Sequence, residues 1–145
     1  MCYDIKVSLE RQLKVARQHG DPDVIAELER KLLPLLNPTE KELNHVSGFA
    51  HPKLFVLTKS NVEYAEWGLI PHWVKDKKSA KEISNKTLNA KGETIFEKPS
   101  FKDSALFNRC IVFVDGFYES QHLNGKTYPH FIQRSDKNLI PLAGL

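Results

Sequence analysis

Hydrophobic residues between Val7 and Leu36 recur every three or four positions, which is the period of an amphipathic α-helix. His19-Gly20 interrupts the pattern, and Asp21-Pro22 supplies a capping residue followed by a proline suited to a first helical turn. The pattern therefore predicts a helical hairpin over residues 7–36 that packs on the core through one apolar face. Its charged positions are typical of a solvated outer face, and we assign the hairpin no chemistry.

The remainder of the chain reads as short strands and helices separated by turns. Residues 37–48 are polar and predict a connection, whereas Lys53–Thr58 and Val62–Trp67 predict two strands joined by a turn. Five consecutive apolar residues, Cys110–Val114, predict a strand buried on both faces and make Cys110 a structural core thiol. Further helices are predicted over Lys75–Asn85, from about Glu93 and over Phe101–Phe107. Further strands are predicted over Phe117–His122, Thr127–Gln133 and Leu139–Leu145. The first two of these strands are joined by a predicted hairpin turn at Asn124-Gly125.

The segment Glu66–Trp73 connects a predicted strand to a predicted helix and carries two tryptophans. A glycine and a proline exclude regular structure throughout it, so we expect a loop that displays Trp67 and Trp73. Both are consistent with core anchors, and one of them is also consistent with a platform on which an unpaired base stacks. The basic residues that begin at Lys75 favour the stacking interpretation.

Composition places the chain among ordinary soluble proteins. Its 145 residues fit one domain, and 41% hydrophobic and 27% charged residues are typical of a globular fold. No long apolar run and no basic segment followed by an apolar one is present, so we expect no membrane span or secretory signal and infer a cytoplasmic monomer. Cys2 and Cys110 lie in different contexts, and no Cys or His spacing resembles a zinc site. We therefore expect no disulfide, metal or cofactor.

Positive charge is concentrated in one part of the sequence. The chain carries a formal net charge of +3, and residues 75–109 hold nine basic side chains against five acidic ones. Such a bias is typical of polyanion binding, but a solvated surface produces the same pattern. Charge alone leaves both interpretations open.

The start of the chain, Met1-Cys2, offers reactive chemistry. Cys2 is small enough for an aminopeptidase to remove Met1, which leaves one residue bearing a free α-amine and a thiol. The pKa values of such groups in unperturbed peptides, about 8 and about 8.5, give each a reactive fraction near neutral pH. An aldehyde can form an imine with the amine and then be closed by sulfur into a five-membered thiazolidine. The alternative is an inert cysteine at a frayed terminus.

Other polar side chains are candidates for the same chemistry. Glu119 lies in a strand that we expect to be half-buried, where a carboxyl group suits proton transfer; the alternative is an exposed strand glutamate. Asn89, in a polar turn, can donate a hydrogen bond to a substrate oxygen or simply form the turn. His72 and His130 have no visible partner in the sequence and are assigned no role.

Several motifs in a fixed order resemble the SRAP family, the SOS-response-associated peptidases. Each motif alone is weak, but five in order are specific, and their order and spacing agree from about Glu66 to the end. The motifs are Met1-Cys2, Trp67–Trp73 (WGLIPHW), Leu88–Thr94 (LNAKGET), Asn108–Cys110 (NRC) leading into Asp115–Glu119 (DGFYE), and Pro129–Ile132 (PHFI) before Pro141–Leu145 (PLAGL).

This resemblance implies an α+β fold with a curved, mostly antiparallel, barrel-like sheet flanked by short helices. It implies a protein of the DNA damage (SOS) response that senses abasic sites in single-stranded DNA, at the nucleoid, and traps the ring-opened sugar at Cys2 as a thiazolidine. By the same resemblance, Asn89 positions Cys2 and the sugar, and Glu119 shuttles protons. The peptidase activity would be chiefly the removal of Met1.

The resemblance also implies a DNA-binding surface. Trp67 and Trp73 would line the strand path together with the basic residues Lys75 and Arg109. Lys91 takes the place of a family arginine that contacts phosphate, a change that keeps the charge but loses bidentate geometry.

The chain departs from the family at a few positions. Tyr3-Asp4 stands where Gly-Arg is usual, and Ser120 stands where an aromatic residue is usual. The histidine that the family uses in catalysis falls in a later segment, beyond Leu145. We therefore expect one SRAP-like domain over residues 1–145 that is truncated at its C-terminal side.

Two other kinds of function are consistent with the sequence. One is a non-catalytic domain that binds single-stranded nucleic acid through the tryptophan loop and the basic window. The other is an N-terminal-nucleophile amidohydrolase, which would need an oxyanion hole that the sequence does not reveal.

Overall fold

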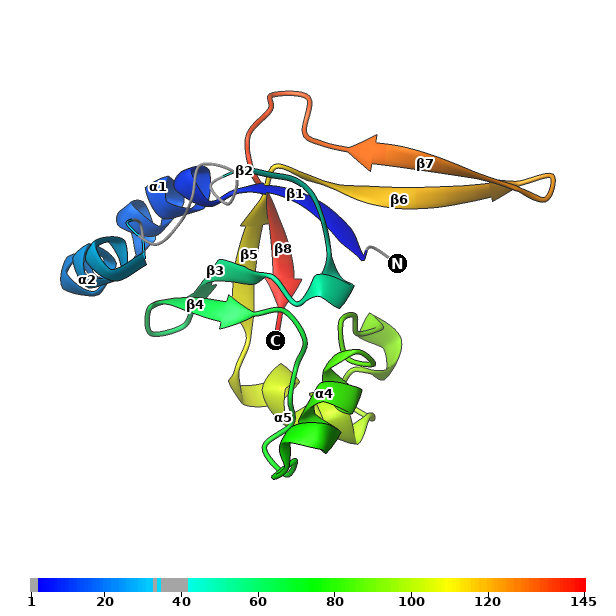
Figure 1. The fold of residues 1–145 in the computed structure, drawn as a ribbon, viewed down its shortest axis with the longest axis horizontal. Coiled ribbons are helices and arrows are strands. Elements are labelled where there is room, and N and C mark those ends of the chain that lie inside the picture. Colours follow the sequence, from blue (N-terminus) through cyan, green and yellow to red (C-terminus); the bar gives the residue numbers. More distant parts are fainter. Residues whose placement is uncertain (1–2, 33, 35–41) are drawn as a thin grey trace.

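Pairs of helices separate runs of strands along the chain, and the computed structural model describes residues 3–32, 34 and 42–145 (Figure 1). The strands are β1 (Asp4–Ser8), β2 (Glu42–Ser47), β3 (Lys53–Thr58), β4 (Val62–Glu66), β5 (Cys110–Val114), β6 (Gly116–Leu123), β7 (Lys126–Ile132) and β8 (Ile140–Gly144). The helices are α1 (Leu9–His19), α2 (Pro22–Leu32), α4 (Lys77–Ser84) and α5 (Pro99–Phe107), with short 3₁₀ turns η2 (Gly48–Ala50) and η3 (Gly92–Thr94).

The strands form two antiparallel sheets. One sheet has the strand order β2-β1-β6-β7, and the other has the order β4-β3-β5-β8. Asp115 joins β5 of one sheet directly to β6 of the other. The sheets do not close into a barrel within the described chain, but the predicted α+β class with mostly antiparallel pairing is confirmed.

The core lies where α1 packs on both sheets. Its buried apolar members are Ile5, Val7, Leu9, Leu13, Ala16, Ile25, Leu54, Phe55, Val62 and Val114. Gln12 on the inner face of α1 is only 2% exposed, and both polar atoms of its amide are hydrogen-bonded. The amide nitrogen donates to the Phe113 carbonyl of β5, and the amide oxygen accepts from the Phe55 N–H of β3. One side chain therefore joins α1 to two neighbouring strands.

The predicted helical hairpin is present but shorter than the pattern suggested. It breaks at Gly20 as predicted, and the Asp21 side chain accepts a hydrogen bond from the Asp23 N–H at the start of α2. A Cβ atom on Gly20 would come within 2.8 Å of Val62, so this bend requires glycine to pack against β4. Val7 belongs to β1 instead of the helix, and residues 33, 35 and 36 lie outside the described residues.

Three other predictions are corrected. Residues 42–47 of the polar connection form β2, because β1 provides a partner strand that the sequence pattern did not reveal. The helix expected from about Glu93 is only the 3₁₀ turn η3. The strand β5 is not buried on both faces: Val114 is fully buried, but Ile111 is 39% exposed.

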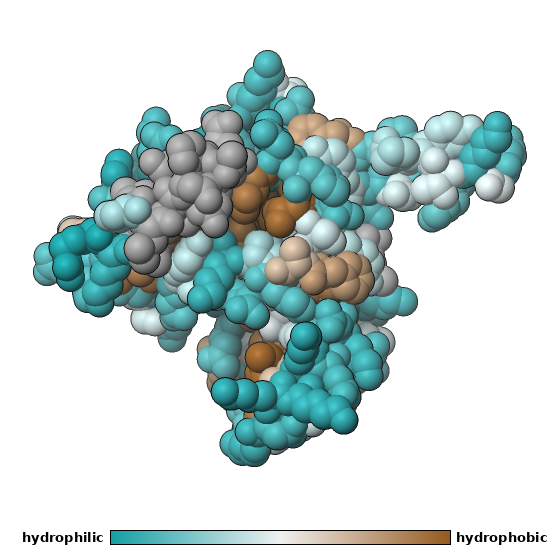
Figure 2. All heavy atoms as spheres, viewed as in Figure 1, coloured by the Kyte–Doolittle hydropathy of each residue, from teal (hydrophilic) through white to brown (hydrophobic). Residues whose placement is uncertain are grey.

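Strands β6 and β7 form a long hairpin that projects from the body of the molecule, and its outer half carries a mostly hydrophilic surface (Figures 1 and 2). Its tip is Asn124-Gly125, both with positive φ, as the hairpin signal predicted. Strand β7 forms one edge of its sheet and contains Pro129. Strand β8 forms one edge of the other sheet and contains Pro141.

Candidate functional site

Pairing of β1 with β6 places Glu119 near the N-terminus. Asp4 pairs with Tyr118 and Ile5 with Phe117, and Glu119 directly follows Tyr118 on β6. The Glu119 side chain is half-buried, as expected. Cys2 lies outside the described residues, but its covalent neighbour Tyr3 is described. The predicted proton-transfer residue therefore follows the position that pairs with Asp4, which is two residues after the predicted nucleophile.

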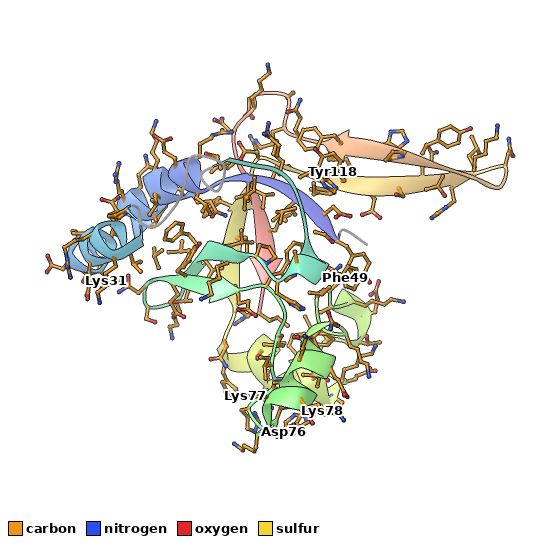
Figure 3. All side chains as sticks on the ribbon, in the orientation of Figure 1. Lys31, Phe49, Asp76, Lys77, Lys78 and Tyr118 are labelled. Carbon is orange, nitrogen blue, oxygen red and sulfur yellow. The ribbon has the colours of Figure 1, made fainter. Side chains whose placement is uncertain are left out.

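The turn η2 holds the backbone of Tyr3 from the other side. The Gly48 N–H donates to the Tyr3 carbonyl over 2.7 Å, at the end of the β1–β2 pairing. The ring of Tyr3 stacks on the ring of Phe49, with centroids 5.4 Å apart and planes inclined by 27°. Figure 3 shows Phe49 on η2, next to the N-terminal end of β1.

Trp67 connects η2 to the segment that carries Asn89. Its indole packs against the hydrophobic core and against Gly48, where an added Cβ would lie 3.2 Å from the indole ring. Its Nε1–H donates to the Leu88 carbonyl over 2.8 Å, one residue before Asn89. The half-buried indole thus spans the two backbone segments that hold Tyr3 and Asn89.

Further hydrogen bonds fix the loop before Asn89. The buried Thr87 hydroxyl donates to the Leu69 carbonyl over 2.6 Å. His51, in the left-handed conformation, donates from Nδ1 to the Trp67 carbonyl over 2.7 Å, and its Nε2 lies 3.1 Å from Asn85 Oδ1. Asn89 itself is half-buried. Its position therefore depends on contacts between segments that are distant in the sequence.

Trp73 differs from Trp67 because its side chain is 49% exposed. Its loop is held at both sides: His72 Nδ1 lies 3.4 Å from a carboxylate oxygen of Asp103 on α5, and the Lys75 ammonium donates to the His72 carbonyl over 2.9 Å. A large aromatic ring on a fixed loop is suited to stacking on a base.

The predicted basic residues are all exposed but are not gathered at one point. Lys91 precedes η3, two residues after Asn89. Arg109 lies at the start of β5, at the opposite end of that strand from the Asp115 bend that leads into β6. Lys75 lies two residues before α4, and the first turn of α4 carries Lys77 and Lys78 (Figure 3). The Asp76 carboxylate caps α4 through the Ser79 N–H, and this hydrogen bond lowers the pKa of Asp76.

The structure also defines the surroundings of the Cys110 thiol and the His130 imidazole. Burial, and secondarily the Glu63 carboxylate, raise the pKa of the half-buried Cys110 thiol, so little thiolate forms there at neutral pH. His130 pairs directly opposite Glu119 in the β6–β7 ladder, a juxtaposition that the sequence alone did not reveal.

A cavity of about 320 Å³ lies between α4 and α5, and its lining includes neither Asn89 nor Glu119. It is lined by Ser79, Glu82, Ile83, Lys86, Thr87, Lys98, Ser100 and Phe101.

Among the described residues, no three Cys, His, Asp or Glu side chains are arranged to hold a metal ion. No helix in that part of the chain is both long and apolar enough to cross a membrane.

Sequence reasoning missed Gly48, Phe49 and His51 as parts of this site. The sequence pattern predicted only a polar connection in this region, which says nothing about a tryptophan packing against it. Their roles come from long-range contacts with Tyr3, Trp67 and Asn85.

Comparison with known proteins gives consistent matches. The sequence profile of the SOS response associated peptidase (SRAP) family matches residues 14–145. The abasic site processing protein YoqW of Bacillus subtilis is 46% identical over 80 residues, which cover 54% of this chain and 34% of YoqW. The abasic site processing protein HMCES of Gallus gallus is 42% identical over 67 residues, covering 46% of this chain and 20% of HMCES. The matches thus span about a third or less of these relatives.

Solved structures match over nearly the whole chain. A protein from Bacteroides thetaiotaomicron aligns with a TM-score of 0.79 and 35% identity, covering 98% of this chain and 58% of that one. A protein from Bordetella bronchiseptica aligns with a TM-score of 0.65 at 19% identity, covering 98% of this chain and 62% of that one, which shows a shared fold.

Proposed function

Because the chain belongs to the SOS response associated peptidase (SRAP) family, we propose that it processes abasic sites in single-stranded DNA. The family identified from the sequence motifs is confirmed by the profile match, and relatives named abasic site processing proteins support the substrate. The observation that carries the proposal is that β1, which begins two residues after Cys2, pairs with β6 at Tyr118, the residue before Glu119. The backbone of Tyr3 contacts η2, and Trp67 links η2 to the Asn89 segment.

The proposed chemistry is covalent capture of an aldehyde. Removal of Met1 frees the Cys2 α-amine, which adds to the aldehyde carbon of the ring-opened sugar and loses water to give an imine. The Cys2 thiol then adds across the C=N bond, sulfur binding carbon while the nitrogen gains a proton, and closes a thiazolidine. Glu119 accepts and returns protons in ring opening and dehydration, and the Asn89 amide orients the sugar. The peptidase activity is the self-removal of Met1.

The DNA strand is held by stacking and by charge in this proposal. The half-exposed Trp73 offers a face to an unpaired base, and Trp67 would lie along the strand path. Lys75, Lys91 and Arg109 are exposed and would neutralise phosphates.

A cross-linking assay tests the proposal. Protein lacking Met1 is incubated with a single-stranded oligonucleotide that carries one abasic site, and the product is heated and resolved on a denaturing gel. We expect a heat-stable adduct that is lost in Cys2→Ala and slowed in Glu119→Gln and Asn89→Ala. An oligonucleotide with a reduced abasic site, which has no aldehyde, is the matched control. Equal adduct yield from Cys2→Ala would exclude Cys2 as the nucleophile.

The second candidate is a non-catalytic single-strand binder, which the exposed Trp73 and the basic surface around α4 favour. It predicts salt-sensitive binding of intact single strands that Cys2→Ala leaves unchanged, with no covalent product. The same oligonucleotides in a salt titration separate the two functions.

A further inference from the structure

We propose that the stacked rings of Tyr3 and Phe49 form a platform for the nucleobase that flanks the abasic sugar. The proposal rests on the proposed function, because that function brings the lesion to Cys2. It assigns a binding role to two aromatic side chains that the family motifs do not include.

The first argument is exposure. Phe49 is 57% exposed although its ring already stacks on Tyr3, so one aromatic face is covered and much of the other side meets solvent. The pair lies beside the N-terminal end of β1 (Figure 3). Every nucleobase has a π face, and stacking on an aromatic side chain is the usual way in which proteins hold an unpaired base.

The second argument is rigid support. The Gly48 N–H holds the Tyr3 carbonyl over 2.7 Å, and the Phe49 N–H donates to the Ser47 hydroxyl over 3.4 Å. The Trp67 indole packs directly beneath Gly48. Both rings are therefore attached to fixed backbone, and a base can stack on them without the cost of ordering a loop.

The third argument is the chemistry around the platform. Tyr3 is covalently bonded to Cys2, so the platform is one residue from the proposed nucleophile. The adjacent Asp4 carboxylate lies 3.6 Å from the His45 imidazole, and a carboxylate at this position disfavours a phosphate. The surface around Tyr3 is thus suited to the uncharged face of a base, whereas phosphates would be bound at the lysines elsewhere.

The test measures binding without covalent capture. The full chain carrying Cys2→Ala is titrated with fluorescent single strands containing a tetrahydrofuran abasic analogue. The nucleotide next to the analogue, on the 5′ or the 3′ side, is adenine, thymine or a second analogue. We expect the tightest Kd with adenine on one side, and a Kd at least about fivefold weaker when that neighbour has no base, the lower limit for one stacked base.

Substitutions identify the platform. Adding Phe49→Ala should make the Kd nearly independent of the neighbouring base, and Phe49→Trp should restore the dependence. Phe107→Ala is the matched control, because Phe107 is 78% exposed at the end of α5 and should leave the dependence intact. Thermal unfolding checks each fold, and Phe49→Leu replaces the alanine variant if the latter unfolds.

The outcomes separate the two proposals. The platform is overturned if the Kd does not depend on the neighbouring base on either side. It is also overturned if the Phe49→Ala variant keeps the full dependence of the Kd on that base. A base-dependent Kd that requires Phe49, together with no adduct from processed wild-type protein, supports the platform and overturns covalent capture. Failure to bind any of the strands overturns the platform, whereas covalent capture is decided by the adduct from processed wild-type protein.

Discussion

The α1 side of the molecule and the loop side that follows β4 are held together in different ways. On the α1 side, ten buried apolar residues form one cluster, and the Gln12 amide bonds to two strands. On the loop side, between Trp67 and Lys91, single hydrogen bonds from Trp67, Thr87 and His51 to backbone carbonyls do most of the positioning. The first side supplies stability, and the second presents half-exposed groups in fixed positions.

The largest expected effect is on the α1 side. Gln12→Ala should lower the free energy of unfolding by about 2–4 kcal/mol, because the Phe113 carbonyl and the Phe55 N–H lose their partner in a buried position. Urea unfolding measures this loss. Lys14→Ala, an exposed position on the same helix, is the control and should change stability by less than about 0.5 kcal/mol. Similar losses for both variants would contradict the assignment.

The next effect is on the loop side and concerns binding. Trp73→Ala should weaken single-strand binding by about 1–3 kcal/mol, the contribution of one stacked base. The same change should leave the unfolding midpoint almost unaltered, because the indole is half-exposed. Fluorescence anisotropy with an unmodified strand gives the Kd. A loss of stability without a loss of binding would make Trp73 a structural residue.

A smaller effect on stability distinguishes Trp67 from Trp73. Trp67→Phe keeps a ring beneath Gly48 but removes the Nε1–H donor to Leu88, so the free energy of unfolding should fall by about 1 kcal/mol. If the bond also positions Asn89, the adduct should form more slowly while the Kd for an unmodified strand stays the same. A weakened Kd with unchanged adduct rate would instead support base stacking by Trp67.

The smallest effect concerns Cys110 and pH. Burial raises the pKa of this thiol in the folded protein, so the unfolded chain releases the proton first as pH rises. The contribution to stability is therefore complete below the unfolded thiol pKa and is lost as pH rises through the folded pKa. Urea unfolding between pH 8 and pH 10 should show a decline that is less steep in Cys110→Ala. Identical slopes would show that Cys110 titrates alike in both states.

Much of the fold could be predicted, because patterns local to each segment decide it. The strands β3, β4, β6 and β7 and the helix pair follow from periodicity and turn residues. The short strands β1 and β2 could not, because their few apolar residues sit among charged ones and become strands only by pairing with each other and with β6.

The site was less predictable for the same reason. Motif order made Asn89 and Glu119 candidates for the site, but it left Trp67 and Trp73 with the same two interpretations. Only packing separates them, since one indole lies against Gly48 and Leu88 and the other faces solvent. The Tyr3–Phe49 stack joins residues more than forty positions apart, and no local pattern signals such a contact.

The prolines in β7 and β8 have a consequence for behaviour in concentrated solution. Strands at the margin of a sheet can recruit other chains through unpaired backbone groups, which leads to aggregation. Pro129 and Pro141 have no N–H to offer an incoming strand, so each interrupts the ladder that such a chain would need to extend. The β7 and β8 margins are therefore poor templates for pairing with another chain.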